Sequence, residues 1–260
     1  MNISTIIGVF GSLGMLVFAI LVGGSSILTF VDIPSVILIF VCPYFLLFTF
    51  SSLRDVLGIF SIINITFKIP NFNEQGIITK LMAMSEKARR EGLLALEEEL
   101  EDLDDEFMKK GMRLVVDGTD AEIIRNLMEN ELNQMQDRHF GKIAIINMWA
   151  SMAPAVGMMG TVIGLIGMLK NLEDKSALGP NMAIALITTF YGSLIANFTM
   201  LPWAGKLKTY DAMEVKVKEM QIEGVLSIQA GDNPRILATK LLSYLDPLDR
   251  KAVEAEVLRD

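Results

Sequence analysis

Two uncharged stretches decide the fold: 143-IAIINMWASMAPAVGMMGTVIGLIGML-169 and 176-SALGPNMAIALITTFYGSLIANFTMLPWAG-205. Neither contains Asp, Glu, Lys, Arg or His, and each is longer than the roughly 20 residues that a helix needs to cross a bilayer. Both are rich in Gly, Ala and Thr, which suits helices that pack backbone to backbone. A bundle without ionisable groups is poorly suited to carrying ions alone, so we expect any ion-binding carboxylate to come from a partner.

Two further apolar runs precede these stretches. Residues 3–31 carry no charge, and none lies between Asp32 and Arg54. Charge-free runs of this length predict two more membrane spans, at about 4–23 and 34–53, joined by a short turn. The first run has no basic segment before it and leads directly into the second, which argues against a cleavable signal peptide. Pro43 is expected to kink the second span.

The distribution of Lys and Arg predicts the topology. Twelve lie in residues 53–142 and nine in residues 205–260, whereas only Lys170 and Lys175 lie elsewhere. The positive-inside rule therefore places the long loop, the tail and both termini in the cytoplasm. The formal net charge of −8 makes nucleic acid an unfavourable partner. Membrane lipid is the expected surrounding of the spans.

These observations predict an all-α membrane protein with four transmembrane helices, a helical cytoplasmic domain between the second and third of them, and a helical C-terminal tail. The expected parts are a transmembrane hairpin at 1–53, the cytoplasmic domain at 54–142, a second transmembrane hairpin at 143–205 and the tail at 206–260. A helix from about 120 is expected to continue into the third span, and the fourth span to continue to about Ile228. Ala230 to Pro234 reads as a turn.

Small residues recur at helical spacing in the last two spans. In the third span the set comprises Ala153, Gly157, Gly160, Gly164 and Gly167. In the fourth span it comprises Ala185, Thr189, Gly192, Ala196 and Thr199. Steps of three and four residues place each set on one helix face, where backbones can approach closely. We consider two interpretations: ordinary tight helix packing, and the inner wall of an oligomer.

Threonines and prolines mark the same spans. Thr161 and Thr189 lie near the small-residue faces, with Thr188 beside the latter. A hydroxyl can replace one water of an ion's hydration shell, or it can bond its own helix backbone. Pro154 and Pro202 both fall nearer the cytoplasmic ends, where each permits either a hinge or a static kink.

The cytoplasmic domain carries a charged segment. Arg89 and Arg90 precede Glu97 and Glu98, and the seven residues from Arg90 to Glu97 make two turns along nearly one helix face. Such a surface is either a solvated face or an electrostatic docking site.

No catalytic or metal-binding motif is recognisable. The sequence has no phosphate-binding loop and no HExxH motif, and His139 and Cys42 are the sole residues of their types. We therefore expect neither an enzyme nor a metal site, and no bound cofactor.

A series of motifs runs in order along the chain and resembles the A subunit of flagellar motor stators, the MotA/PomA family. The matching stretches are ARREGLLALE (88–97), VDG (116–118), APAVGMMGT (153–161), GPNMA (179–183), LITTFYG (186–192), GVLSIQ (224–229) and NPR (233–235). The resemblance is closer to the PomA-like branch than to the long-loop enteric type.

The resemblance implies a homopentamer of A subunits around two B subunits, whose helices carry an aspartate that binds the transported H⁺ or Na⁺. Residues 143–205 would line that channel, and residues 54–142 would face the rotor protein FliG. By family pattern, Arg89 and Glu97 take torque-contact roles, with Arg90 and Glu98 beside them. The coupling roles fall to Pro154 and Pro202.

The same pattern places Thr161 and Thr189 beside the ion path and matches Asp32 to an external acidic residue. It also implies a location in the bacterial inner membrane. Threonine at both positions is compatible with Na⁺ and with H⁺, so the ion stays open. Two alternatives are an energiser subunit like ExbB or TolQ, a family that usually has three spans, and a membrane scaffold that conducts nothing.

Overall fold

The computed structural model describes residues 2–257; Met1 and residues 258–260, at the two ends of the predicted parts, lie outside it. The described chain is a succession of helices without a strand, which confirms the all-α prediction. It forms two compact units, Met1–Ile69 with His139–Thr209 (unit 1) and Pro70–Arg138 with Tyr210–Asp260 (unit 2). Two long helices, α8 (Ala121–Lys170) and α10 (Leu201–Gln229), continue from one unit into the other. Both continuations follow the expected pattern.

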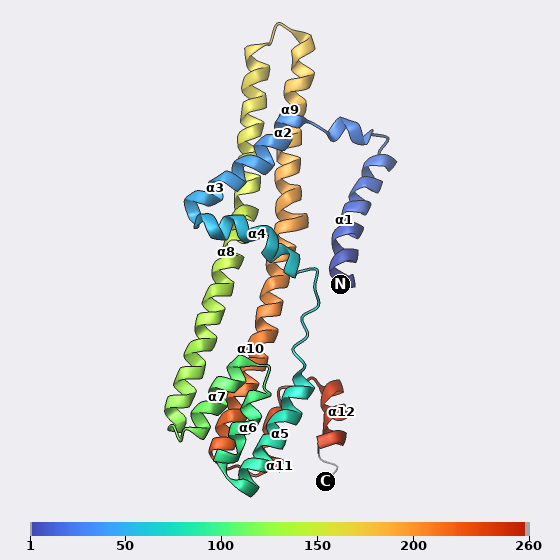
Figure 1. The fold of residues 1–260 in the computed structure, drawn as a ribbon. Coiled ribbons are helices and arrows are strands. Elements are labelled where there is room, and N and C mark those ends of the chain that lie inside the picture. The colour runs from blue at the N-terminus through green and yellow to red at the C-terminus, as the bar shows by residue number, and fades with distance from the viewer. Residues whose placement is uncertain (1, 258–260) are drawn as a thin grey trace. The chain divides into compact units, whose positions relative to one another are not determined.

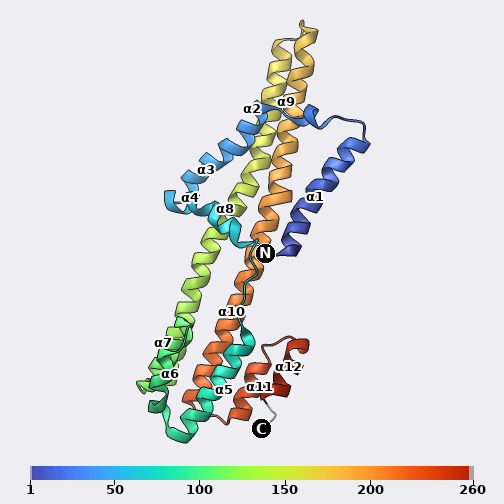
Figure 2. The same ribbon diagram turned by 45° about the vertical axis from the view of Figure 1, so that its right-hand side comes forward.

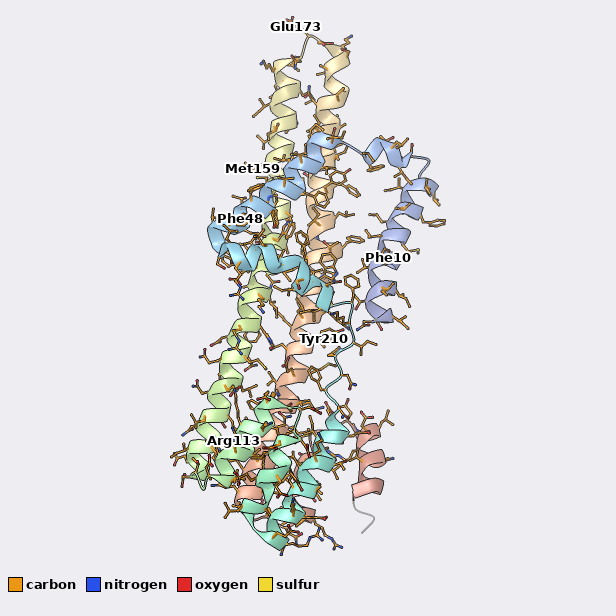
Figure 3. All side chains as sticks on the ribbon, viewed as in Figure 1. Phe10, Phe48, Arg113, Met159, Glu173 and Tyr210 are labelled. Atoms are coloured by element: carbon orange, nitrogen blue, oxygen red, sulfur yellow. The ribbon has the colours of Figure 1, made fainter. Side chains whose placement is uncertain are left out.

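Unit 1 contains the apolar helices. Besides parts of α8 and α10 they are α1 (Ile3–Val22), α2 (Ile33–Val36), α3 (Cys42–Phe50), α4 (Leu53–Ile65) and α9 (Lys175–Leu194). A 3₁₀ turn, η1, covers Ile27–Phe30. Four stretches of the described chain are long and apolar enough to cross a membrane: Ile3–Val22, Ile33–Phe50 and segments within Ala121–Lys170 and Lys175–Gln229. Figure 1 shows α8 and α9 running side by side to a tip, where Figure 3 places Glu173.

Two spans contain π-helical segments immediately before a proline. One is η2 (Ile37–Val41), which is followed by Pro43; the other is η4 (Ile195–Met200), which is followed by Pro202. A proline has no N–H for the preceding turn, and its ring crowds the carbonyl four residues back. A π-helical turn changes the hydrogen-bond register and is one of the recognised causes of helix bending. Pro154, by contrast, lies within continuous α8.

The predicted N-terminal hairpin differs from the observed arrangement. α1 packs near η4, whereas α2 packs against α9, and the two lie on opposite sides of α9 in both views (Figures 1 and 2). The start of α1 is fixed by Asn2 N–H, which donates to Phe67 O at 2.8 Å, and by the hydroxyl of Thr5, which donates to Thr66 O at 3.2 Å. No residue of α1 is buried, and the Phe10 side chain stands outward in Figure 3.

α4 belongs to unit 1, although residues from 54 onward were expected in the cytoplasmic domain. Its buried residues Val56, Ile59 and Ile63 join the apolar cluster that contains Leu47 and Trp149. Burial of side chains of this size is worth about 1.5–3 kcal/mol each, which explains why α4 stays with the membrane helices. The compact division therefore falls after Ile69.

Unit 2 is a helical domain with its own core. Besides parts of α8 and α10, its helices are α5 (Glu74–Glu91), α6 (Glu97–Glu101), α7 (Glu106–Val116), α11 (Pro234–Leu242) and α12 (Pro247–Val257). Fully buried side chains from four of them, Leu81, Met108, Ile124 and Val225, meet in one cluster. α7 has the clearest apolar stripe, which is why its period is readable in the sequence.

The charged segment is not one helix, and this corrects the prediction that Arg90 and Glu97 share a helix face. α5 ends at Glu91, Gly92 adopts φ +91°, and a 3₁₀ turn, η3 (Leu93–Leu96), precedes α6. A positive φ of this kind is readily adopted by glycine and rarely by other residues, so Gly92 breaks the helix where the spacing predicts continuity. An ion pair of 3.1 Å between Lys87 and Glu99 joins the two arms.

Asp105 links α7 to α10 in unit 2. Its carboxylate caps α7 by accepting the N–H groups of Phe107 and Met108, each at 3.0 Å. The same carboxylate accepts hydrogen bonds from Lys218 Nζ at 3.0 Å and from Gln221 Nε2 at 2.8 Å. Burial by itself raises the pKa of Asp105, but the bonds from Gln221, the Met108 N–H and Lys218 outweigh it. The pKa of this carboxyl therefore lies below its ordinary value.

We expect Asp105→Ala to lower the free energy of unfolding by about 2–4 kcal/mol, because it removes a helix cap and a charge-assisted acceptor. Chemical denaturation of the full chain in detergent measures this loss. Asp102→Ala is the control, since Asp102 is exposed and lies nearby. Because the folded-state pKa of Asp105 is depressed, its stabilisation is complete above the unfolded-state pKa of about 4. It is lost as the pH falls through the folded-state value, so the two proteins should converge in stability in acid. An equal loss in the Asp102 variant contradicts this role.

Candidate functional site

The hairpin of α8 and α9 is held by direct backbone approach. A Cβ added to Gly157 would lie 2.9 Å from Thr188 O, and one added to Gly192 would lie 2.6 Å from Ala153 O. Such distances are shorter than real side chains tolerate, so glycine at these positions is required by the closeness of the helices.

The other three glycines of the α8 face meet α9 in the same way. A Cβ at Gly160 would meet the Thr188 side chain at 2.5 Å, and one at Gly164 or Gly167 would meet Asn181 at 2.6 or 2.5 Å. The glycine face of α8 is therefore used within the chain. This corrects the idea that it forms an oligomer's inner wall, since a face already covered by α9 cannot also face another helix.

Thr161 and Thr189 meet at the edge of this interface. Their Oγ1 atoms are 2.6 Å apart, and both hydroxyls also bond the carbonyl of Gly157, at 3.2 and 3.4 Å. Thr161 is half-buried and Thr189 is exposed. Two hydroxyl oxygens and one carbonyl oxygen thus gather at the surface of a hairpin that has no charge of its own.

Thr188 lies on a different face. Its side chain is fully buried against Gly160 and bonds the carbonyls of Ile184 and Ala185 in its own helix, at 2.9 and 3.2 Å. These contacts are structural, and the structure does not bring the Thr188 hydroxyl to the exposed edge beside Thr189.

An exposed stripe on α9 contains Thr189. Met182, Leu186, Thr189 and Ser193 step by four, three and four residues, and all four are exposed. Ser193 is a polar member that the sequence interpretation missed, although its spacing from Thr189 is one helical turn. Asn197 Nδ2 donates to Ser193 O at 2.9 Å, which extends the polar row towards η4.

The two prolines have unlike surroundings. Pro154 is half-buried at the helix interface, where its Cα would lie 3.1 Å from a Cβ on Gly192. Pro202 is exposed, follows η4 and lines a cavity beside α1. The structure therefore does not bring them together as a symmetric pair.

Asp32 is the N-cap residue of α2. Its carboxylate accepts the N–H and the hydroxyl of Ser35, at 2.9 and 2.5 Å. The adjoining η1 turn is fastened to α9, because the Tyr191 hydroxyl donates to Phe30 O. Asp32 thus has a local structural role as the cap of its own helix.

The charged candidates of unit 2 lie on two elements around the Gly92 bend. Arg89 and Arg90 end α5, and Glu97 and Glu98 begin α6; all four are exposed. Arg90 also pairs with Glu86 of its own helix at 3.5 Å. The bend presents both signs of charge on one exposed corner.

Residues 99–220 match the MotA/TolQ/ExbB proton channel family. This match covers parts of both units, including the α8–α9 hairpin, and it defines the class of protein: a membrane protein of the ion-channel superfamily that includes motor stators and energiser subunits.

Full-length relatives narrow the class. The chain is 53% identical to motility protein A of Treponema phagedenis over 260 residues, which is all of both proteins. It is 33% identical to the chemotaxis protein PomA of Vibrio alginolyticus over 98% of this chain and all of that protein. The chain therefore belongs to the motility protein A family, and it is a stator subunit of the flagellar motor.

Solved structures agree with this. The flagellar MotAB stator complex of Bacillus subtilis contains a chain with TM-score 0.87 and 32% identity, which covers 95% of this chain and 97% of that one. A chain of C. jejuni MotAB has TM-score 0.88 and 28% identity over the same shares. The apolar helices and these relatives together indicate a protein of the inner membrane.

Proposed function

We propose that five copies of this chain surround the membrane helices of two MotB-like B subunits and turn around them as H⁺ or Na⁺ passes. The support comes from the family and from the names of the solved MotAB complexes. Both termini lie in the cytoplasm in this arrangement, as the Lys and Arg distribution predicts. Residues 143–205 line the channel, and residues 54–142, apart from α4, make up the rotor-facing domain together with the tail at 206–260.

The single observation that carries the proposal is the hydroxyl pair of Thr161 and Thr189 on an uncharged hairpin. A cation that leaves a partner's aspartate needs oxygen ligands in place of lost water, and the pair supplies them with the Gly157 carbonyl. No carboxylate of the hairpin competes for the ion. The exposed stripe of α9 through Thr189 is the surface that faces the partner helix.

The driving force is sufficient for stepping. An ion that crosses about 150 mV releases roughly 3.5 kcal/mol. This energy biases a step between ring positions only if ion release and movement are coupled. Pro154 is placed for coupling because it touches the Gly192 contact between α8 and α9, so that a bend of α8 there changes the hairpin. For Pro202 the proposal rests on its position directly after η4.

Co-expression tests the proposal. Cells that lack their own stator should swim when they receive this chain and the single-span protein encoded beside it, and neither protein alone should suffice. Replacement of Na⁺ by K⁺ in the medium then identifies the ion, because swimming that persists indicates H⁺. Swimming by cells that receive this chain without a B subunit contradicts the proposal.

The exposed corner around Gly92 is the proposed contact with the rotor protein FliG. Arg89, Arg90, Glu97 and Glu98 offer both signs of charge, which favours a defined docking orientation and a fast encounter. Surface ion pairs contribute little to stability, so these residues are free to serve a partner.

Arg90→Glu is expected to reduce torque strongly while the stator still assembles. Arg125→Glu is the matched control: Arg125 pairs with Glu129 at 3.6 Å in the same i, i+4 arrangement that joins Arg90 to Glu86. Each reversal should lower stability by only about 0.5 kcal/mol. Tethered-cell rotation measures torque, and an opposite reversal on the rotor should restore it. Equal torque in the two variants removes Arg90 from the contact.

A further inference from the structure

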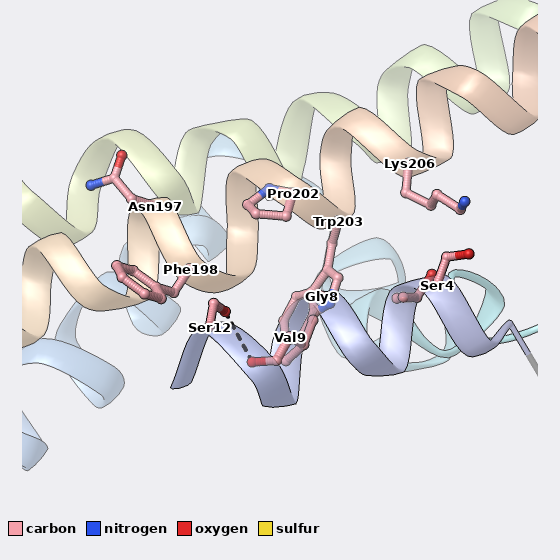
Figure 4. A pocket seen from close by; sticks show the side chains of 10 residues that line it. Ser4, Gly8, Val9, Ser12, Asn197, Phe198, Pro202, Trp203 and Lys206 are labelled. Atoms are coloured by element: carbon pink, nitrogen blue, oxygen red, sulfur yellow. Dashed lines mark hydrogen bonds between the residues drawn. The ribbon is translucent and has the colours of Figure 1, made fainter. Parts of the chain in front are cut away.

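A cavity of about 470 Å³ lies in unit 1 between α1 and the η4–α10 segment. Figure 4 shows Ser4 and Lys206 at one end of it and Ser12 with Phe198 at the other. The wall between them is formed by Gly8, Val9 and Trp203. Its volume is within the range of roughly 300–1,000 Å³ that small-molecule sites occupy.

The cavity changes from polar to apolar along its length. The end at Ser4 and Lys206 carries a hydroxyl and an amine, close to the start of α1 and to the first charged residue after the uncharged stretch. Towards Phe198 the wall is mainly apolar. This gradient matches a molecule with a charged head and a hydrocarbon tail.

Trp203 gives a second indication. Its indole Nε1 is buried and has no hydrogen-bond partner in the described structure, although it lines the cavity. A buried N–H without an acceptor costs about 1–3 kcal/mol. An acceptor oxygen in the cavity removes that cost, and tryptophan prefers the depth at which lipid headgroups meet hydrocarbon.

We propose that this cavity binds one anionic glycerophospholipid of the leaflet at the α1 N-terminus, which is the cytoplasmic leaflet in the proposed orientation. Lys206 and Ser4 bind the phosphate, the Trp203 N–H donates to a headgroup or ester oxygen, and an acyl chain follows Gly8, Val9 and Phe198. Basic pockets between helices on the cytoplasmic side are a recognised setting for acidic lipids. α1 is bare of buried residues, so lipid has access to the cavity from the bilayer.

Two pairs of variants separate this site from general lipid contact. Lys206→Gln removes the charge, and Lys208→Gln is its control, because Lys208 is exposed and does not line the cavity. Gly8→Leu fills the cavity, and Gly11→Leu is its control. A Cβ at either glycine meets nothing within 4 Å, but only Gly8 lines the cavity.

Native mass spectrometry of the full chain in detergent, titrated with phosphatidylglycerol or phosphatidylcholine, measures binding. We expect one phosphatidylglycerol to be retained in preference to phosphatidylcholine. Lys206→Gln should weaken it about fivefold, equivalent to ~1 kcal/mol, and Gly8→Leu should remove it, while both controls bind as the wild type does. Thermal unfolding checks that each variant is folded.

Three results overturn the proposal: equal retention of both lipids, equal binding by all folded variants, or a cysteine cross-link from Gly8→Cys to a second copy that shows protein in the cavity. Binding is measured without motility. A failed lipid test therefore leaves the stator proposal intact, and a failed motility test leaves the lipid site intact.

Discussion

Gly192→Ala is expected to abolish swimming. The added methyl would lie 2.6 Å from Ala153 O and 3.1 Å from Pro154 Cα, and backbone atoms cannot turn away as a flexible side chain can. α8 and α9 must separate locally, which costs about 1–3 kcal/mol for overpacking and moves the segment at Pro154. A change of one methyl group should therefore disturb both packing and coupling.

Gly205→Ala is the matched control, because a Cβ there meets nothing within 4 Å. Alanine in place of glycine inside a helix gains up to about 1 kcal/mol, so this variant should accumulate and swim normally. Immunoblots of membranes and swimming speed are measured together. If Gly192→Ala cells swim at wild-type speed with wild-type protein levels, the close contact of α8 and α9 is absent from the working motor.

Thr189→Val is expected to stop ion-driven swimming while the protein remains folded. Valine keeps the shape of threonine but lacks the hydroxyl, and Thr161 still bonds Gly157 O. Structure is therefore preserved, and the ion loses one oxygen ligand at the exposed edge. The double replacement of Thr161 and Thr189 by valine should be at least as severe.

Two neighbours make this test specific. Thr189→Ser retains the hydroxyl and should preserve swimming, whereas Thr188→Val removes a buried hydroxyl that bonds only its own helix and should be tolerated. Swimming speed and membrane levels are again measured for each variant. If Thr188→Val stops swimming and Thr189→Val does not, the ion path lies on the other face of α9.

The sequence predicts the helices of this chain better than it predicts their neighbours. Uncharged runs and Lys and Arg positions identify the membrane spans, because charge is too costly to bury there. Periodicity identifies the residues that share a face, but it does not say what the face meets. The glycine face of α8 could therefore be read as a channel wall, although it is covered by α9.

Local breaks were the other limit. Gly92 interrupts a run of good helix formers, and only its φ of +91° shows that the chain turns there. α4 was assigned to the cytoplasmic domain because of its few charges, whereas its buried Val56, Ile59 and Ile63 join the membrane unit. Ser193 was within reach of the spacing argument, since it lies one turn from Thr189 on the exposed stripe.

The central claim is that this chain supplies oxygen ligands and a moving ring, while a partner supplies the charged ion site. Ion uptake by proteoliposomes tests it most directly, with this chain reconstituted alone or together with its B subunit under an imposed membrane potential. Uptake should require both proteins and should be lost when the B-subunit aspartate is replaced by asparagine. Uptake by this chain alone, at the rate of the complex, would contradict the claim.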